Sequence, residues 1–166
     1  DDGGNTTITV TDQAGRVIDA DDPNAGHTSN TYDPAGHLTN TIDALAHSVS
    51  TEYDPLGRPT GRWTGTATTY AAAAPTERVG AWTYDTVPGA KGLPSTDSTW
   101  QGGLEYRSTV LAYDTRYHPT STKFTMPGSF GTDVLAGDWK FAATFNEAGH
   151  QLTASAPTAF SAARAA

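Results

Sequence analysis

Hydrophobic and polar residues alternate in short runs along this chain, and turn-forming residues separate the runs. Ile8 and Val10 alternate with threonines. Leu38, Asn40 and Ile42 likewise occupy every second position, with threonines between them. A period of two places successive side chains on opposite faces of a strand, so the pattern predicts half-buried antiparallel strands. The 28 threonines suit a pleated surface.

An aspartate opens each turn in the first part of the chain. These aspartates fall 10, 11, 10 and 11 residues apart, at Asp12, Asp22, Asp33, Asp43 and Asp54. In the form Asp-Pro-x-Gly, the aspartate accepts amide hydrogen bonds, proline has a fixed φ and glycine tolerates positive φ, as in a type I hairpin turn. Turns of about four residues leave about six for each strand, the commonest strand length. The period predicts a stack of hairpins; the alternative is a β-sandwich with similar turns by chance.

The spacing divides the chain into four segments. We expect a single all-β domain over residues 1–166, a long curled antiparallel sheet of consecutive β-hairpins. Regular repeats occupy 5–66, an irregular connection 67–80, wider-spaced repeats 81–153 and an Ala/Ser-rich tail 154–166.

The wider-spaced part keeps the motif in altered form. From Asp54, turn residues follow after 31, 29 and 32 residues at Asp85, Asp114 and Asn146. Each interval is near three half-periods, which predicts one extra strand per interval and about 13 to 15 strands in all. Candidates for the additional turns are Pro94, Gly102-Gly103, Pro127-Gly128 and Gly137-Asp138.

Composition restricts the classes of function. The net charge is −8 with only 10 lysines and arginines, which argues against nucleic acid and anionic membranes as partners. The absence of cysteine excludes disulfides and thiolate metal sites, and no apolar run is long enough to insert in a membrane. The chain opens abruptly on Asp1-Asp2-Gly3-Gly4, so we expect a piece of a larger protein whose targeting signal, if any, lies upstream.

The recurring motif has a family likeness. Tyr32-Asp33-Pro-Ala-Gly36-His37-Leu38 and Tyr53-Asp54-Pro-Leu-Gly57-Arg58 resemble the YD repeat of Rhs-type proteins. Asp12-Gln-Ala-Gly15-Arg16-Val17 and Asn146-Glu-Ala-Gly149-His150 are degenerate copies. Trp82-Thr-Tyr84-Asp85, followed by Tyr113-Asp114, also resembles the long actinobacterial members.

The resemblance implies a structural, non-catalytic role. In that family the repeats wind into a hollow β-shell, which encloses a toxic domain in bacterial polymorphic toxins or a component of insecticidal toxin complexes. Animal teneurins use a similar barrel for adhesion. Such shells run to many hundreds of residues, so this chain would be part of a wall in a larger secreted or cell-surface protein. Its partners would be the remainder of its own shell and an enclosed C-terminal toxin domain.

The residues that we expect to hold the repeat turns are structural. They are Asp12, Gly15, Arg16, Tyr32, Asp33, Pro34, Gly36, His37, Tyr53, Asp54, Pro55, Gly57, Arg58, Tyr84, Asp85, Tyr113, Asp114, Asn146 and Gly149. We expect no catalytic residue, cofactor or metal ion. A metal site at His27 and His47 is disfavoured because two strands, about 10 Å, would separate them.

Three other possibilities remain open at this stage. Carboxylate pairs such as Asp21-Asp22, or the separate Glu52 and Asp54, are weak candidates for glycosidase chemistry. The aromatic residues favour an extended carbohydrate-binding or adhesin-like β module as the alternative function, with glycans as partners; they are Trp63, Trp82, Trp100, Trp139, Tyr70, Tyr84, Tyr106, Tyr113 and Tyr117. A cut shell would also have open edges, which predicts edge-to-edge self-association.

Overall fold

The computed structural model describes residues 6–128 and 136–157 of the 166-residue chain. The chain forms two compact units, Asp1–Val79 and Gly80–Ala166. Their boundary falls at the end of the expected irregular connection, and the single-domain organisation stays a prediction. No helix in the described ranges is long and apolar enough to cross a bilayer.

The first unit is an antiparallel meander. Its strands are β1 (Ile8–Thr11), β2 (Val17–Asp22), β3 (Gly26–Tyr32), β4 (Leu38–Ile42), β5 (Ser48–Tyr53) and β6 (Pro59–Thr64). Strands that follow one another in the chain, from β1 to β6, pair antiparallel. A connection that contains the 3₁₀ helix η1 (Tyr70–Ala72) leads to β7 (Arg78–Tyr84), which begins at the end of this unit.

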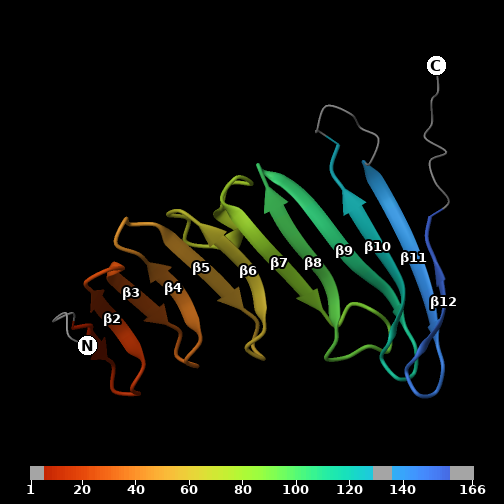
Figure 1. Ribbon diagram of the computed structural model, residues 1–166, viewed down its shortest axis with the longest axis horizontal. Helices are drawn as coiled ribbons and strands as arrows, with labels where there is room; N and C mark the ends of the chain where they lie inside the picture. Colours follow the sequence, from red (N-terminus) through yellow and green to blue (C-terminus); the bar gives the residue numbers. More distant parts are fainter. Residues whose placement is uncertain (1–5, 129–135, 158–166) are drawn as a thin grey trace. The chain divides into compact units, whose positions relative to one another are not determined.

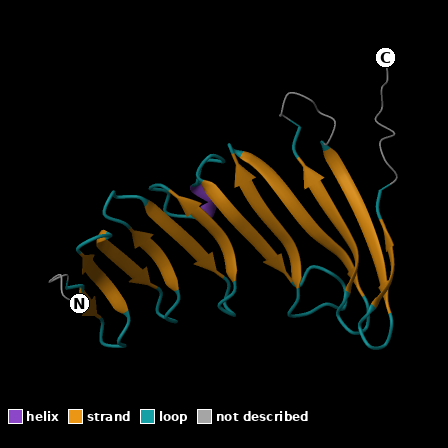
Figure 2. Ribbon diagram, in the orientation of Figure 1, coloured by secondary structure: helices purple, strands orange, loops and turns teal. Residues whose placement is uncertain are grey.

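The second unit repeats the same topology with longer strands (Figure 1). After β7 come β8 (Pro94–Gln101), β9 (Leu104–Tyr113), β10 (Pro119–Met126), β11 (Gly137–Phe145) and β12 (Gln151–Ser155). All of these neighbours pair antiparallel. Strands and turns make up nearly all of the described chain (Figure 2), so the predicted all-β fold of consecutive hairpins is confirmed.

The prediction of an extra strand in each wide interval is wrong. Two strands fill each interval in the described ranges, which hold twelve strands in total. The additional residues lengthen β8, β9, β10 and β11 to 8, 10, 8 and 9 residues, or enter the loops. The physical reason is that an even number of strands returns the chain to the same end of the sheet. Two strands per interval do so, whereas three would not.

The predicted additional turns are only partly where the sequence suggested. Gly102-Gly103 joins β8 to β9, but Pro94 opens β8 and Gly137-Asp138 opens β11. Pro127-Gly128 follows β10, and 129–135 lie outside the described residues. Of the expected tail, 154–155 end β12, and 158–166 are likewise outside them.

Burial in the first unit is concentrated beneath the connection between β6 and β7. Trp63 is only 3% exposed, and its indole Nε1 donates to the Ala67 carbonyl at 2.8 Å. Tyr70 packs on Gly61, where an added Cβ would lie 2.6 Å from the ring. Glu52 accepts a hydrogen bond from the Tyr70 amide at 2.8 Å. A polar anchor and one tryptophan therefore hold this connection against the sheet.

Much of the apolar surface is left open to solvent. The exposed large side chains include Ile8, Val10, Leu38, Ile42, Val49, Leu111, Phe124, Phe141 and Leu152. Strand residues of one parity normally pack on a second layer. A sheet that exposes this much apolar surface is suited to contact further protein.

We predict that replacing Val10 by lysine reduces self-association of the chain. Val10 is 51% exposed on β1, whose only partner among the described strands is β2, so its second edge is open. A charge on an open edge disfavours pairing with another chain. Sedimentation velocity over a range of concentrations would show more monomer for V10K.

The matched control is Leu56→Lys, because Leu56 is 75% exposed but lies in the turn between β5 and β6. Equal effects of the two substitutions would point to general solubility and not to edge pairing. A wild-type chain that remains monomeric at every concentration would contradict the prediction.

Candidate functional site

One short turn is built around the carboxylate of its first residue. In the turn between β5 and β6, the Asp54 amide donates to the Arg58 carbonyl and the Gly57 amide to the Asp54 carbonyl, both at 2.9 Å. Asp54 Oδ1 accepts from the amides of Leu56 and Arg58 at 2.9 and 3.0 Å. Asp54 Oδ2 accepts from Arg58 Nε at 2.7 Å. Both carboxylate oxygens therefore hold the turn.

Five other turns share this backbone geometry. In every one of the six, the amide of the first residue donates to the carbonyl of the fifth at 2.9–3.0 Å, and the amide of the fifth donates to the side-chain Oδ1 of the first at 2.8–3.0 Å. The pairs of first and fifth residues are Asp12 and Arg16, Asp33 and His37, Asp43 and His47, Asp54 and Arg58, Asp114 and His118, and Asn146 and His150.

The fifth residue of each aspartate turn carries a basic side chain that returns to the carboxylate. Arg16 and Arg58 do so through Nε and Nη2, each 2.7 Å from Oδ2. His37 and His118 place Nδ1 at 2.8 and 2.9 Å from Oδ2 of Asp33 and Asp114. With a carboxylate as acceptor, Nδ1 carries the proton. Nε2 of each ring is therefore directed away from its own turn.

These contacts favour the ionised carboxylates. The backbone amide of Arg58, followed by its guanidinium, lowers the pKa of Asp54. The imidazole of His37, followed by its amide, lowers the pKa of Asp33. At Asp114, desolvation opposes the shift, but the amide and ring of His118 outweigh it and the pKa is lowered. Hydrogen bonds to the charged form are the common cause.

The fourth residue of each turn has a positive φ. Glycine supplies it in four of the six turns, for example Gly15 at 78° and Gly57 at 77°. Ala46 and Tyr117 occupy the same position in the other two at 61° and 68°. A side chain in this region costs about 1–2 kcal/mol. The turn is thus strong enough to impose a disfavoured conformation on two residues.

Two of the predicted aspartate turns differ from this pattern. Asp22 Oδ1 accepts from the amides of Asn24 and Ala25, and strand pairing continues to Gly26. The fifth residue of this segment is Gly26, and the basic residue His27 is the sixth; both belong to β3. The turn at Asp22 keeps the regular spacing of the aspartates but lacks the five-residue geometry of the other turns.

His27 instead lies between two carboxylates of β2. Its Nδ1 is 2.9 Å from Asp21 Oδ1 and its Nε2 is 2.9 Å from Asp19 Oδ1. The hydrogen bond to Asp21, with the charges of both carboxylates, raises the pKa of His27. Strand pairing explains the cluster, because Asp21 and His27 are direct cross-strand partners.

Asp85 holds a longer loop. Its amide donates to the Leu93 carbonyl at 3.1 Å, and its Oδ1 accepts from the Gly92 amide. The residue itself has a φ of 65°. The loop buries Val87 and Ala90, and the Thr86 amide donates to Ser95 Oγ at 2.9 Å. Tyr84-Asp85 thus begins a loop of nine residues instead of a turn of five.

Turns at the two ends of the meander are not alike. In the first unit, Asp12, Asp33 and Asp54 connect odd to even strands and lie at one end, whereas Asp22 and Asp43 lie at the other. In the second unit, Asp85, Asp114 and Asn146 also connect odd to even strands and share one end. The structural repeat of the first unit is therefore 21 residues, the separation of Asp12, Asp33 and Asp54.

A tyrosine before the aspartate ties each repeat to the previous one. The Tyr32 hydroxyl donates to the Val17 carbonyl at 3.0 Å, and the Tyr53 hydroxyl to the Leu38 carbonyl at 3.0 Å. Val17 and Leu38 are the first residues after the preceding turn at that end. Tyr113 makes the same kind of bond, at 2.8 Å, to the Pro94 carbonyl.

The basic fifth residue stacks on the aromatic ring of the next repeat. The His37 and Tyr53 rings are 4.8 Å apart at 24°. Arg16 lies over Tyr32 with its guanidinium carbon 4.7 Å from the ring centroid. In the second unit, His118 stacks on Phe145 at 4.8 Å. Contacts of this kind between cation and ring, or between two rings, are each worth about 0.5–1.5 kcal/mol.

The glycine of the next turn lies against the same basic side chain. A Cβ on Gly57 would be 2.5 Å from His37 Nε2, on Gly149 3.1 Å from His118 Nε2, and on Gly36 3.3 Å from Arg16 Nη1. Gly15, in the first such turn described, has nothing within 4 Å of an added Cβ. We call this series of interlocked turns, with their Asp, basic, aromatic and glycine positions, the turn ladder.

Comparison with known proteins identifies the repeat. The RHS Repeat family model matches residues 32–74, which contain the turns at Asp33, Asp43 and Asp54. This segment is therefore similar to the RHS repeat. No curated protein matches the chain.

Solved structures share the fold of this chain. The Tc holotoxin pore of Photorhabdus luminescens with a mutated TccC3 matches 90% of the chain with a TM-score of 0.62 at 12% identity. TcdB2-TccC3 matches 90% with 0.62 at 11% identity, and TcdB2-TccC3 without its hypervariable C-terminal region matches 90% with 0.63 at 12% identity. The chain spans about 8% of the length of each.

Sequence reasoning placed most ladder residues in turns but missed some of their partners. The structure adds His118 and Phe145, and it separates Tyr84-Asp85 from the short turns. The five-residue spacing from Asp114 to His118 indicates such a turn, but it is hard to recognise because Tyr117 replaces the usual glycine. Pro34 and Pro55 occupy the second position of their turns. The structural role of the predicted residues stays a prediction.

The other candidate chemical groups are dispersed through the chain. His37 and His47 each contact the aspartate of their own turn, and His27 contacts Asp19 and Asp21. Within the described ranges, no group of three or more such side chains is arranged to hold a metal ion. Glu52 holds the connection after β6.

We predict that Gly57→Ala is more destabilising than Gly15→Ala. The two glycines have nearly the same φ, 77° and 78°, so both substitutions cost about 1–2 kcal/mol in backbone strain. Only at Gly57 does the new methyl meet His37, which its contacts with Asp33 and Tyr53 hold in place. Crowding of this kind costs about 1–3 kcal/mol more. Urea unfolding would measure the difference.

The double variant Gly57→Ala/His37→Ala tests the cause of that difference. Removing the imidazole should reduce the additional cost of the alanine at position 57, because the space is then empty. Equal costs of G57A and G15A in the wild-type background would contradict the interlocking of successive turns.

We predict that Asp54→Asn removes an acid-dependent part of stability. Because the pKa of Asp54 is lowered in the folded state, its contribution is complete above the ordinary value of 3.8 and is lost as the pH falls through the lower folded value. Asn146 shows that an amide makes the same backbone contacts. The melting temperature of D54N should therefore be below that of the wild type at pH 6 and approach it at lower pH.

The control is Glu147→Gln, which removes a negative charge from the second position of a turn. Its difference from the wild type should depend less on pH than that of D54N. A deficit of D54N that grows on acidification would contradict the assigned role of the carboxylate.

Proposed function

We propose that this chain is a structural segment in the wall of an RHS-repeat β-shell, within a larger secreted or cell-surface bacterial protein. The turn ladder is the observation that carries the proposal. In three of the turns, the basic side chain (Arg16, His37 or His118) contacts the aromatic ring and lies against the glycine of the following repeat at the same end. Such an arrangement lets identical units be added in series, as in other repeat proteins.

The surface of the sheet supports a role within a larger assembly. Side chains such as Ile8, Val10 and Ile42 are 61%, 51% and 39% exposed, and few large residues are buried. The chain is structurally similar to segments that make up about 8% of much longer chains, which also supports a place within a larger assembly. A wall segment would complete its second layer with other parts of the same protein.

The likeness also supports a partner for the wall. The matched structures contain TccC3, and the match is retained in TcdB2-TccC3 without its hypervariable C-terminal region. The matched segment therefore lies outside that region. By analogy, we propose that this chain belongs to an enclosing part and that a C-terminal toxin or effector domain is its cargo. The role of the chain itself would be non-catalytic.

A carbohydrate-binding or adhesin-like module is the second candidate function. One observation favours it: several aromatic side chains of the second unit share a face of the sheet with polar groups between them. This alternative predicts selective glycan binding without an enclosed domain.

The full-length product of the gene tests the proposal. Electron microscopy should show a hollow shell, and limited proteolysis should leave a C-terminal domain protected. Breaking the ladder with Gly57→Ala should increase cleavage of that domain more than Gly15→Ala does. A product that ends with these 166 residues, or that forms no hollow particle, would overturn the wall proposal.

A further inference from the structure

A cavity of about 520 Å³ lies in the first unit, bordered by β4, β5, β6 and the connection after β6. Its lining includes Asn40, Ser50, Glu52, Trp63 and Thr68. Strand register brings these residues together, because Ser50 is the cross-strand partner of Asn40 on one side and of Trp63 on the other. Ligand sites have volumes of about 300–1,000 Å³, so the cavity is large enough for one small ligand.

The polar groups of the cavity are rich in oxygen acceptors. Glu52 Oε1 accepts from the Tyr70 amide at 2.8 Å, which holds the carboxylate and leaves Oε2 as an acceptor. Ser50 is only 8% exposed, and its Oγ accepts from Asn40 Nδ2 at 2.7 Å with a second lone pair remaining. Asn40 Nδ2 also donates to Ser48 Oγ, so the amide oxygen of Asn40 is the acceptor that remains. Such a set suits a ligand with several N–H donors.

The charge around the cavity is negative. Residues 6–79 contain nine carboxylate side chains and four arginines, without a lysine. Arg16 and Arg58 are each paired with the aspartate of their own turn at 2.7 Å, and Arg62 points to the opposite face from its neighbour Trp63. Among the described residues that line the cavity, none is a lysine or an arginine. A cation is therefore favoured over an anion.

Glu52 is the carboxylate best placed to bind a cation. Asp33 also borders the cavity, but the amide and the imidazole of His37 occupy its two oxygens. A guanidinium binds a carboxylate best through both oxygens, and one oxygen of Glu52 is already engaged. An ammonium group has three donors and needs one oxygen from each partner. Within the described ranges, no cluster of three such side chains is arranged for a metal ion.

The indole of Trp63 gives the cavity an apolar wall. Trp63 is 3% exposed and its Nε1 donates to the Ala67 carbonyl at 2.8 Å, so the ring is held in place. Both residues line the cavity. The alkyl stem of an amine can pack on such a wall while its charged head contacts the polar groups.

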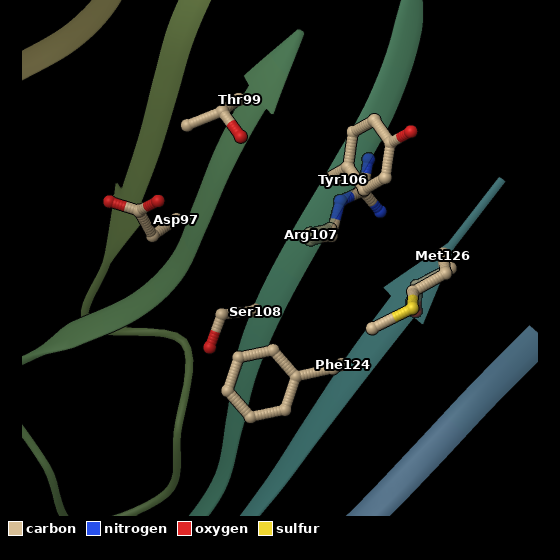
Figure 3. Close-up of a pocket in the computed structure, with 8 residues that line it drawn as sticks. Asp97, Thr99, Tyr106, Arg107, Ser108, Phe124 and Met126 are labelled. Carbon is tan, nitrogen blue, oxygen red and sulfur yellow. The ribbon is translucent and has the colours of Figure 1, made fainter. Parts of the chain in front are cut away.

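A second hollow, of about 270 Å³, has a different character. It lies on β8 to β10 of the second unit, and its lining includes Asp97, Arg107, Ser108 and Phe124 (Figure 3). Because it contains a guanidinium as well as a carboxylate, it does not favour a cation over an anion. The charge of the lining therefore distinguishes the cavity of the first unit.

From these contacts, we propose that the cavity of the first unit binds a primary ammonium group on an unbranched alkyl chain. Glu52 Oε2 accepts a charge-assisted hydrogen bond from the ammonium, and Ser50 and Asn40 accept the other two. Trp63 covers the alkyl stem. Free diamines and lysine side chains both present this chemistry. The site goes beyond the proposed wall function, which requires no ligand.

Isothermal titration calorimetry of the 166-residue chain tests the proposal. Cadaverine is the probe for a free diamine, and Nα-acetyl-lysine methylamide is the probe for a lysine side chain. We expect a Kd of about 1 mM for at least one of them, and the tighter binder identifies the source. Pentanediol lacks the charge and Nα-acetyl-arginine methylamide carries a guanidinium, so each should bind about tenfold more weakly. The indole N–H resonance of Trp63 should shift on binding.

One substitution and its matched control locate the site. Glu52→Gln keeps an oxygen for the Tyr70 amide but loses the charge, so it should weaken amine binding about tenfold. Glu77 accepts from the Ala74 amide of the same connection at 3.0 Å and is not among the lining residues. Glu77→Gln should therefore change the affinity less than about twofold. Circular dichroism checks folding, and Ser50→Ala replaces E52Q if that variant does not fold.

Three results would overturn the proposal. They are the absence of saturable binding of either amine, binding of pentanediol or the arginine derivative as tight as that of the amines, and equal losses in E52Q and E77Q. The calorimetry does not depend on whether the full-length product forms a shell. Failure of this site and failure of the wall proposal are therefore recognised separately.

Discussion

The structure depends on the carboxylate that opens five of the six short turns. It accepts hydrogen bonds from two backbone amides and from the basic side chain of the fifth residue, as Asp54 does with Arg58 at 2.7 Å. The basic side chain is thereby placed where the next aromatic ring and glycine pack on it. One group thus determines the turn, the register of its hairpin and the contact with the following repeat. Protonating it would weaken all three, because the lowered pKa reflects the same hydrogen bonds.

This arrangement compensates for a small core. Trp63, Ala73, Val87 and Ala90 are the buried hydrophobic residues of the described chain. In most domains one apolar face packs on a second layer and supplies most of the stability. In this chain, contacts between adjacent repeats supply a larger share of the stability. A change in one turn is therefore expected to affect its neighbours more than distant repeats, as in other linear arrays.

The sequence was informative where a structural role requires a particular residue. Aspartate at the start of a turn and glycine at positive φ are such cases, so the hairpins and their order could be predicted. Spacing alone was misleading at Asp22, where an aspartate at the right interval makes a different turn. It was misleading again between Asp54 and Asn146, because loop and strand lengthening look like additional strands.

Contacts between repeats could not be derived in the same way. The stacking of His37 on Tyr53 joins residues 16 positions apart, and their proximity depends on the strand register. Register also unites Trp82, Asp97, Ser108 and Phe124, which come from four strands and form no motif in the sequence. Tyr117 concealed a complete turn because it has a φ of 68°, a conformation that local preference assigns to glycine.

The ladder occupies only one end of the hairpins in each unit. At the other end the connections range from the two residues Gly102-Gly103 to the thirteen-residue segment 65–77. One margin therefore carries the contacts between successive copies, whereas the connections at the other margin differ widely in length. Insertions in such proteins are therefore expected mainly at this second margin, because a longer loop there leaves the contacts between successive copies intact.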